Sequence, residues 1–174
     1  MRIEIFELLF GMIYLSAGVA GLIPAALMPP PADAPALAVN VLYGYALGLF
    51  PVNVLETALH LAVGVWGILG WRGVARSRGF ARSLAVVAAA LAVLGLIPGL
   101  NTLFGLMPLY GHDIWLHGVT AAVAAYFGWS PAVSLERRAR PLGDRREQTV
   151  PVGNDRRTGH SDRRLPNQVI EEKP

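Results

Sequence analysis

Two long stretches without a charged residue constrain the fold of this chain more than any other feature. Residues 8–28 and residues 83–111 contain no Asp, Glu, Lys or Arg. Each stretch, coiled as a helix, is long enough to cross the roughly 30 Å hydrocarbon core of a bilayer. The chain is also 53% hydrophobic and 16% charged, whereas soluble domains average roughly 25% charged residues. We therefore expect an integral membrane protein.

The apolar segments predict an all-α, polytopic membrane fold, with four transmembrane helices in a bundle. Their expected limits are 4–28, 51–71, 82–100 and 108–129. Prolines exclude a regular helix directly after the first segment, and residues 36–50, which include Gly44 and Gly48, are expected to form an interfacial or broken helix. Glu4 and Glu7 stand where a secretory signal carries basic residues, so we expect the first helix to be retained.

Charge divides the chain into two regions. Basic and acidic residues balance over residues 1–134, so the net charge of +3 comes from residues 135–174. We predict a four-helix transmembrane domain over 1–134 and a disordered, Arg-rich cytoplasmic tail over 135–174, because the tail has few apolar side chains. Since the basic residues of the tail alternate with acids, no nucleic-acid partner is predicted.

Three arginines follow the fourth predicted helix directly. Arg137, Arg138 and Arg140 are candidate contacts with anionic lipid headgroups, each worth about 1 kcal/mol near the surface. The alternative is a stop-transfer and solubilising tail. We favour that alternative, because the interspersed acids weaken the field that polybasic lipid-binding segments depend on.

The placement of arginines also predicts the orientation. Residues 71–83 contain four arginines and the tail contains nine, whereas the other two connections between helices contain neither Lys nor Arg. The positive-inside rule then places both termini and the middle connection on the cytoplasmic side of a bacterial inner membrane. The proline-rich connection is expected outside.

The two halves of the chain repeat short motifs. Residues 19–24 read Val-Ala-Gly-Leu-Ile-Pro and residues 93–98 read Val-Leu-Gly-Leu-Ile-Pro. Pro51 and Pro108 each follow a Gly-Leu pair by two residues, and His60 and His117 follow these prolines at the same separation. We predict two helical hairpins that form a parallel repeat, related by an axis along the membrane normal.

Small residues recur at spacings that favour close helix contact, although an alanine-rich composition would explain them equally well. They are Ala85, Ala88, Ala89 and Ala92 in the third segment, Gly64, Gly67 and Gly70 in the second, and Ala17 and Gly21 in the first.

Four ionisable residues form a candidate intramembrane polar cluster. Glu56 stands four residues before His60, and Asp113 stands four residues before His117. This spacing places acid and histidine on one face of a helix, one turn apart. An ionisable group within a bilayer costs roughly 2.5–3.5 kcal/mol, so we expect the four side chains to face the bundle interior and to pair.

Three interpretations of this cluster remain open. It can hold the bundle together through hydrogen bonds, or it can carry protons or ions. In the third interpretation His60 and His117 are ligands of a metal or haem, although no cofactor is firmly predicted. Because the first and third segments have almost no polar side chains, a conduction path within one chain is not predicted unless a homo-oligomer completes it.

The sequence contains no motif that indicates catalysis. There is no cysteine, and we find no phosphate-binding loop, zinc signature or nucleophile elbow. His112 is expected to be a solvated loop residue. We therefore predict no enzyme, but a small structural or accessory membrane protein whose partner is the lipid bilayer.

The sequence also resembles a known family. Its motifs run from Gly48-Leu49-Phe50-Pro51-Val52-Asn53 to Leu59-His60-Leu61, and from Gly111 to His117. Over roughly residues 6–129 they are similar to those of the bacterial four-helix membrane proteins catalogued as domain of unknown function 4383. The resemblance implies architecture and location but adds no reaction.

The chain departs from the family pattern at one place. The family commonly has a His-Asn pair where this chain has Glu56 and Thr57, while His60, Asp113 and His117 keep the pattern. A mechanism that needs three histidines therefore does not carry over to this chain.

Overall fold

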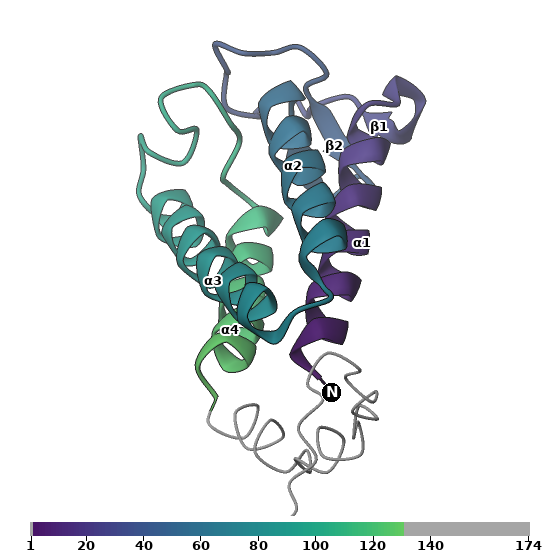
Figure 1. Ribbon diagram of the computed structural model, residues 1–174. Helices are drawn as coiled ribbons and strands as arrows, with labels where there is room; N and C mark the ends of the chain where they lie inside the picture. Colours follow the sequence, from purple (N-terminus) through teal and green to yellow (C-terminus); the bar gives the residue numbers. More distant parts are fainter. Residues whose placement is uncertain (1, 131–174) are drawn as a thin grey trace, which may run out of the picture. The chain divides into compact units, whose positions relative to one another are not determined.

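Four α-helices account for most of the described structure. The computed structural model describes residues 2–130 of the chain. The helices are α1 (Ile3–Gly21), α2 (Val54–Gly70), α3 (Val74–Leu96) and α4 (His112–Trp129), and the short 3-10 helix η1 (Pro24–Ala26) follows α1 (Figure 1). The predicted helical class is thus confirmed for these residues, with a small sheet that the sequence did not predict. The tail from 135 onward, with Arg137, Arg138 and Arg140, lies outside the described residues.

The helices pack as two hairpins. α1 packs mainly against α2, and α3 packs mainly against α4. The long connections 22–53 and 97–111 lie at one end of the helices, which we call the loop end (Figure 1). Residue 2 and the short connection 71–73 lie at the opposite end, which we call the N-terminal end.

Glycines bring α1 and α2 into backbone contact. A Cβ atom built on Gly64 would lie 2.5 Å from the backbone nitrogen of Leu15, and one built on Gly67 would lie 2.7 Å from Cα of Gly11. Neither position has room for a side chain, so the two helices approach as small-residue motifs permit. The prediction that Gly64 and Gly67 face another helix is thereby confirmed.

Other small residues were placed less accurately by the sequence. Ala17 is exposed, and Gly18 instead packs against Leu61 of α2. On α3, Ala85 and Ala88 are buried, whereas Ala89 is exposed.

Five helix limits differ from the predicted ones by three residues or more. Two of these are the start of α2, at Val54 rather than at residue 51, and the end of α3, at Leu96 rather than at residue 100. α1 ends at Gly21 rather than at residue 28, because Pro24 lacks the N–H that would continue the helix. α3 begins at Val74 rather than at residue 82, because arginine is a good helix former and does not mark a loop. α4 begins at His112 rather than at residue 108, after Gly111 adopts a left-handed φ of 66°.

The expected interfacial or broken helix at 36–50 is wrong. Strands β2 (Gly44–Ala46) and β3 (Phe50–Val52) form an antiparallel hairpin, and β1 (Leu27–Met28) pairs with the other edge of β2. The register places Tyr45 opposite Pro51. The hairpin turns through residues 47–49, since Gly48 suits a tight reversal better than a helix interior.

The apolar core lies toward the N-terminal end. Phe6 of α1 stacks on Phe127 of α4 with ring centroids 4.6 Å apart, and it meets Phe80 of α3 at 6.5 Å. We call these three residues the aromatic core. Ile3, Leu84 and several alanines of α3 and α4 surround it. The core thus joins both hairpins near the ends that are farthest from the long connections.

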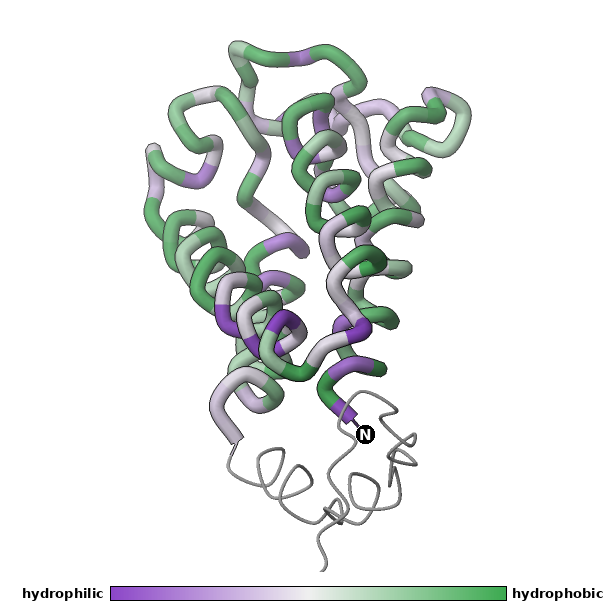
Figure 2. Tube along the Cα trace, viewed as in Figure 1, coloured by the Kyte–Doolittle hydropathy of each residue, from purple (hydrophilic) through white to green (hydrophobic). Residues whose placement is uncertain are grey.

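Two helices are long and apolar enough to cross a membrane, α1 and α3, while α2 is apolar but shorter. Hydrophobic residues dominate the helices in Figure 2. Among the described residues, large apolar side chains are exposed on every helix. Examples are Ile13 of α1, Leu69 of α2, Val86 of α3 and Val119 of α4.

Candidate functional site

Asn53 fixes the start of α2. Its side-chain oxygen accepts hydrogen bonds from the backbone N–H groups of Leu55 and Glu56, both at 3.1 Å. An N-cap of this kind satisfies two of the amide groups that a helix leaves unpaired at its start. Glu56 therefore lies in the first turn of α2, at the loop end.

The same side chain connects the two long loops. The amide nitrogen of Asn53 donates to the carbonyl oxygens of Val39 at 2.8 Å and Leu106 at 2.7 Å. The backbone N–H of Ala38 also donates to the carbonyl of Gly105 at 2.8 Å. These bonds hold the connection of one hairpin against the connection of the other.

α4 presents the second half of the site. Asp113 lies in its first turn, and His117 follows one turn later, so both side chains lie on the helix face that is buried. Before this helix, the N–H of Leu109 donates to the carbonyl of Asn101 at 2.8 Å. The connection 97–111 therefore forms a hydrogen bond within itself just before α4 begins.

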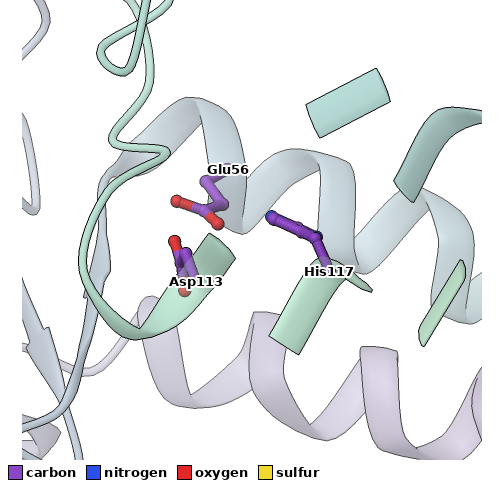
Figure 3. A group of neighbouring side chains, drawn as sticks. All are labelled: Glu56, Asp113 and His117. Carbon is purple, nitrogen blue, oxygen red and sulfur yellow. The ribbon is translucent and has the colours of Figure 1, made fainter. Parts of the chain in front are cut away.

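Three of the four predicted cluster residues converge. One donor atom each of Glu56, Asp113 and His117 lies within 4.8 Å of the other two. Glu56 and Asp113 are 2% exposed and His117 is 7% exposed. Figure 3 shows the carboxyl groups facing each other and the imidazole directed toward Glu56. We call these three residues the polar cluster.

Several atoms of the polar cluster have no hydrogen-bond partner among the described residues. These buried atoms are Oε2 of Glu56, Oδ2 of Asp113 and Nε2 of His117. The remaining carboxyl oxygens let Glu56 and Asp113 share a hydrogen bond, which requires a proton on one of the two groups. Buried polar atoms are usually paired, so three such atoms at one place point to a further ligand.

His60, the fourth predicted residue, lies at the edge of the cluster. Its ring contacts the ring of Tyr14 at a centroid distance of 5.3 Å. It also lines a small cavity of about 20 Å³ next to Glu56 and His117. Apolar side chains of α2 and α3 and Met107 form most of the remaining wall. This volume is enough for about one water molecule.

His112 lies outside the cluster although it is next to Asp113 in the chain. It is exposed and accepts a hydrogen bond of 2.9 Å from the indole nitrogen of Trp115. The expectation of a solvated residue agrees with this position, but His112 is the first residue of α4 rather than part of a loop.

Five buried polar residues were not predicted as part of a site: Glu7, Asn53, Thr57, Ser77 and Thr120. Asn53 caps α2, and Thr57 lies next to Glu56 and contacts Gly21. Glu7 is fully buried near the N-terminal end, against Gly70. The Asn53 cap had a signal, because Asn followed three residues later by Glu before an apolar run marks a helix start.

The comparisons with known proteins add one finding. A family model described as domain of unknown function (DUF4383) matches residues 4–130. No curated protein and no solved structure matches the chain. The match spans all four helices and both halves of the polar cluster, and it confirms the resemblance that the motifs indicated. The chain therefore belongs to the family described as domain of unknown function (DUF4383).

Proposed function

We propose that this protein is a small structural or accessory component of a bacterial cytoplasmic membrane. In this proposal all four helices cross the bilayer, and the polar cluster joins the α1–α2 hairpin to the α3–α4 hairpin. The observation that carries it is the convergence of Glu56 from α2 with Asp113 and His117 from α4.

The exposed apolar surface supports a membrane location. Only 28% of the residues in the apolar stretch of α1 are buried, and 39% in that of α3. The core helix of a soluble protein is mostly buried, whereas a bundle in lipid keeps its apolar side chains on the outside. Exposed apolar surface on all four helices would be a liability in water.

The charge distribution supports one orientation. Arg72 lies in the connection 71–73, and Arg76 lies in the first turns of α3, both toward the N-terminal end. The connections at the loop end contain neither Lys nor Arg. The positive-inside rule then assigns the N-terminal end to the cytoplasm and the loop end to the outside.

The location of the polar cluster supports a fastening role. Within lipid, the hydrophobic effect does not drive helices together, so interhelical polar contacts and close packing hold a bundle. The aromatic core joins the hairpins near the N-terminal end, and the polar cluster joins them near the loop end. Two separate contacts at opposite ends fix the angle between the hairpins.

The aromatic core also bears on the alternative of proton or ion conduction. A conducting path needs polar groups or water along its length. Phe6, Phe80 and Phe127 fill the interior on the cytoplasmic side of the cluster. This packing favours a site that is reached from the loop end over a path across the bundle.

Labelling of single cysteines tests the location and orientation, because the natural chain has no cysteine. Asp33→Cys and Arg72→Cys replace exposed residues at the two ends. In spheroplasts, a membrane-impermeant maleimide is expected to label the Asp33 variant directly and the Arg72 variant only after permeabilisation. The reverse pattern would contradict the orientation, and recovery of the protein without detergent would contradict the membrane location.

A matched pair of neighbouring substitutions tests the fastening role. Asp113→Ala is expected to lower the melting temperature of the detergent-solubilised protein, since it leaves the Glu56 carboxyl buried without its partner, at a cost of about 1–3 kcal/mol. His112→Ala changes the adjacent, exposed side chain and is expected to have little effect. Equal melting temperatures for the two variants would contradict the role.

A further inference from the structure

We propose that the polar cluster is a binding site for one divalent transition-metal ion, with Glu56, Asp113 and His117 as protein ligands. The proposal depends on the proposed function only in taking this cluster as the contact between the hairpins. It adds a bound metal ion to the cluster, which the fastening role does not require.

The geometry suits an ion held between two helices. A tetrahedral ion with bonds of about 2.1 Å keeps its ligand atoms about 3.4 Å apart. The donor atoms of the cluster lie within 4.8 Å of one another, so small side-chain rotations bring them to this separation. The ligands come from α2 and α4, and facing helices of a bundle are a common origin of acid and histidine ligands.

The unpartnered atoms point to the same ligand. Oε2 of Glu56, Oδ2 of Asp113 and Nε2 of His117 are buried without a hydrogen-bond partner among residues 2–130. Each of these atoms is a metal donor when deprotonated. A single ion between them would satisfy all three.

The charges favour a dication. Two carboxyl groups lie side by side, and neither α2 nor α4 contains a Lys or Arg. The positive ends of the two helix dipoles favour the deprotonated acids, because both acids lie in the first turn of their helix. A divalent ion neutralises both carboxylates at once, and its binding releases the proton that they otherwise share.

The donor set narrows the choice of metal. Imidazole with carboxylate oxygens suits Zn²⁺, Mn²⁺ or Fe²⁺, whereas Cu⁺ favours sulfur ligands, which this cluster does not offer. Three protein ligands leave a tetrahedral ion one open position. The small cavity beside Glu56 and His117 has room for about one water molecule there.

Metal loading of the purified full-length protein tests the proposal. The protein, tagged without histidines, is stripped with a chelator in detergent, then equilibrated with Zn²⁺, Mn²⁺ or Co²⁺ and freed of unbound ion. We expect about one ion per chain by mass spectrometry. Co²⁺ is expected to add the visible d–d absorption of a four-coordinate nitrogen and oxygen site.

Two conservative substitutions locate the site, and two others serve as controls. Glu56→Gln and His117→Gln keep the volume of the side chain and are expected to weaken binding at least ten-fold. His112→Ala removes a nearby exposed imidazole, and Glu7→Gln neutralises a buried carboxyl near the N-terminal end. Both controls are expected to keep the stoichiometry and the Co²⁺ spectrum of the wild type.

The outcomes separate this proposal from the fastening role. A wild-type protein that binds none of the three ions overturns the metal site, and so does binding that the Glu56 variant retains or the His112 variant loses. None of these results depends on the melting behaviour of Asp113→Ala, which tests fastening alone when it is measured on the chelator-stripped protein. If a cluster variant does not fold, the wild-type stoichiometry and Co²⁺ spectrum still decide the question.

Discussion

The side-chain amide of Asn53 donates a hydrogen bond of 2.7 Å to the carbonyl oxygen of Leu106. Asn53 belongs to one half of the chain and Leu106 to the other, so this bond crosses between the hairpins. Because the same side chain also caps α2, it positions Glu56 relative to the connection that leads into Asp113. One buried residue therefore couples the start of a helix to the geometry of the polar cluster.

Replacement of Asn53 is expected to remove two separable contributions to stability, the cap of α2 and the hydrogen bonds from the side-chain amide. Asn53→Ala removes the cap and both amide hydrogen bonds, with an expected loss of about 2–4 kcal/mol. Asn53→Asp keeps the capping oxygen but cannot donate to Val39 and Leu106, so it should lose only part of this amount. Thermal unfolding in detergent measures both, and an alanine variant as stable as the wild type would contradict the coupling.

The contact between α1 and α2 predicts a contrast between two glycines. Gly64→Ala places a methyl group 2.5 Å from the backbone of Leu15, which should cost about 1–3 kcal/mol through overpacking. Gly118→Ala lies in α4 with nothing within 4 Å of its new Cβ. It should be neutral or stabilise the helix by up to about 1 kcal/mol. Melting temperatures that change in the same direction would argue against a tight α1–α2 contact.

Arg82 contacts the C-terminal end of α4. Its Nε donates to the carbonyl of Gly128 at 2.9 Å, and its guanidinium lies over the ring of Trp129. Arg82→Lys keeps the charge but loses the planar donor, so we expect a loss of about 1 kcal/mol.

Arg72→Lys is the control for this change, because Arg72 stacks on Trp71 at the same centroid distance of 5.5 Å. The control should unfold within a degree or two of the wild type. Hydrogen exchange at the last turn of α4 should increase in the Arg82 variant alone, and equal exchange in both variants would remove the special role of Arg82.

The tyrosines of the two long connections predict an alkaline transition. Burial, together with hydrogen bonds to Tyr43 and Tyr45, raises the pKa of Tyr110 above its ordinary value of 10.0. The folded chain therefore keeps this proton at a pH where the unfolded chain releases it. The stabilising contribution is complete below about pH 10 and is lost as the pH rises further.

Melting temperatures measured from about pH 8 to about pH 12 check this expectation. The wild type should lose stability above pH 10 more steeply than Tyr110→Phe. Tyr126→Phe, at a residue that is 60% exposed, should follow the wild type. A Tyr110 variant with the wild-type slope would contradict the assignment.

The helices could be predicted because the length of an apolar segment can be read directly from the sequence. Three of the differing limits depend on local chemistry that hydropathy does not measure. Pro24 ends the first helix early, Gly111 delays the fourth, and arginines such as Arg76 extend the third. The hairpin of β2 and β3 was missed because a short apolar stretch with glycines does not distinguish a strand from a broken helix.

The same reasoning predicted only part of the polar cluster. The four-residue spacing of Asp113 and His117 predicts that both lie on the same face of a helix, and the structure confirms this. The equal spacing of Glu56 and His60 suggested an equal role for His60, but the structure places that ring beside Tyr14, at the edge. Which residues meet across α2 and α4 depends on the loop contacts of Asn53, which join segments far apart in sequence.

The early end of α3, at Leu96, has a consequence for the surrounding lipid in the proposed membrane location. Beyond Arg82, the uncharged part of this helix covers residues 83–96, which rise about 21 Å. A bilayer core of roughly 30 Å exceeds this length. If α3 crosses the bilayer as proposed, the membrane should become thinner beside it, or the arginine stems should stretch toward the phosphates, at a fraction of a kcal/mol per Å. Lipids with short acyl chains should consequently accumulate around this face of the protein.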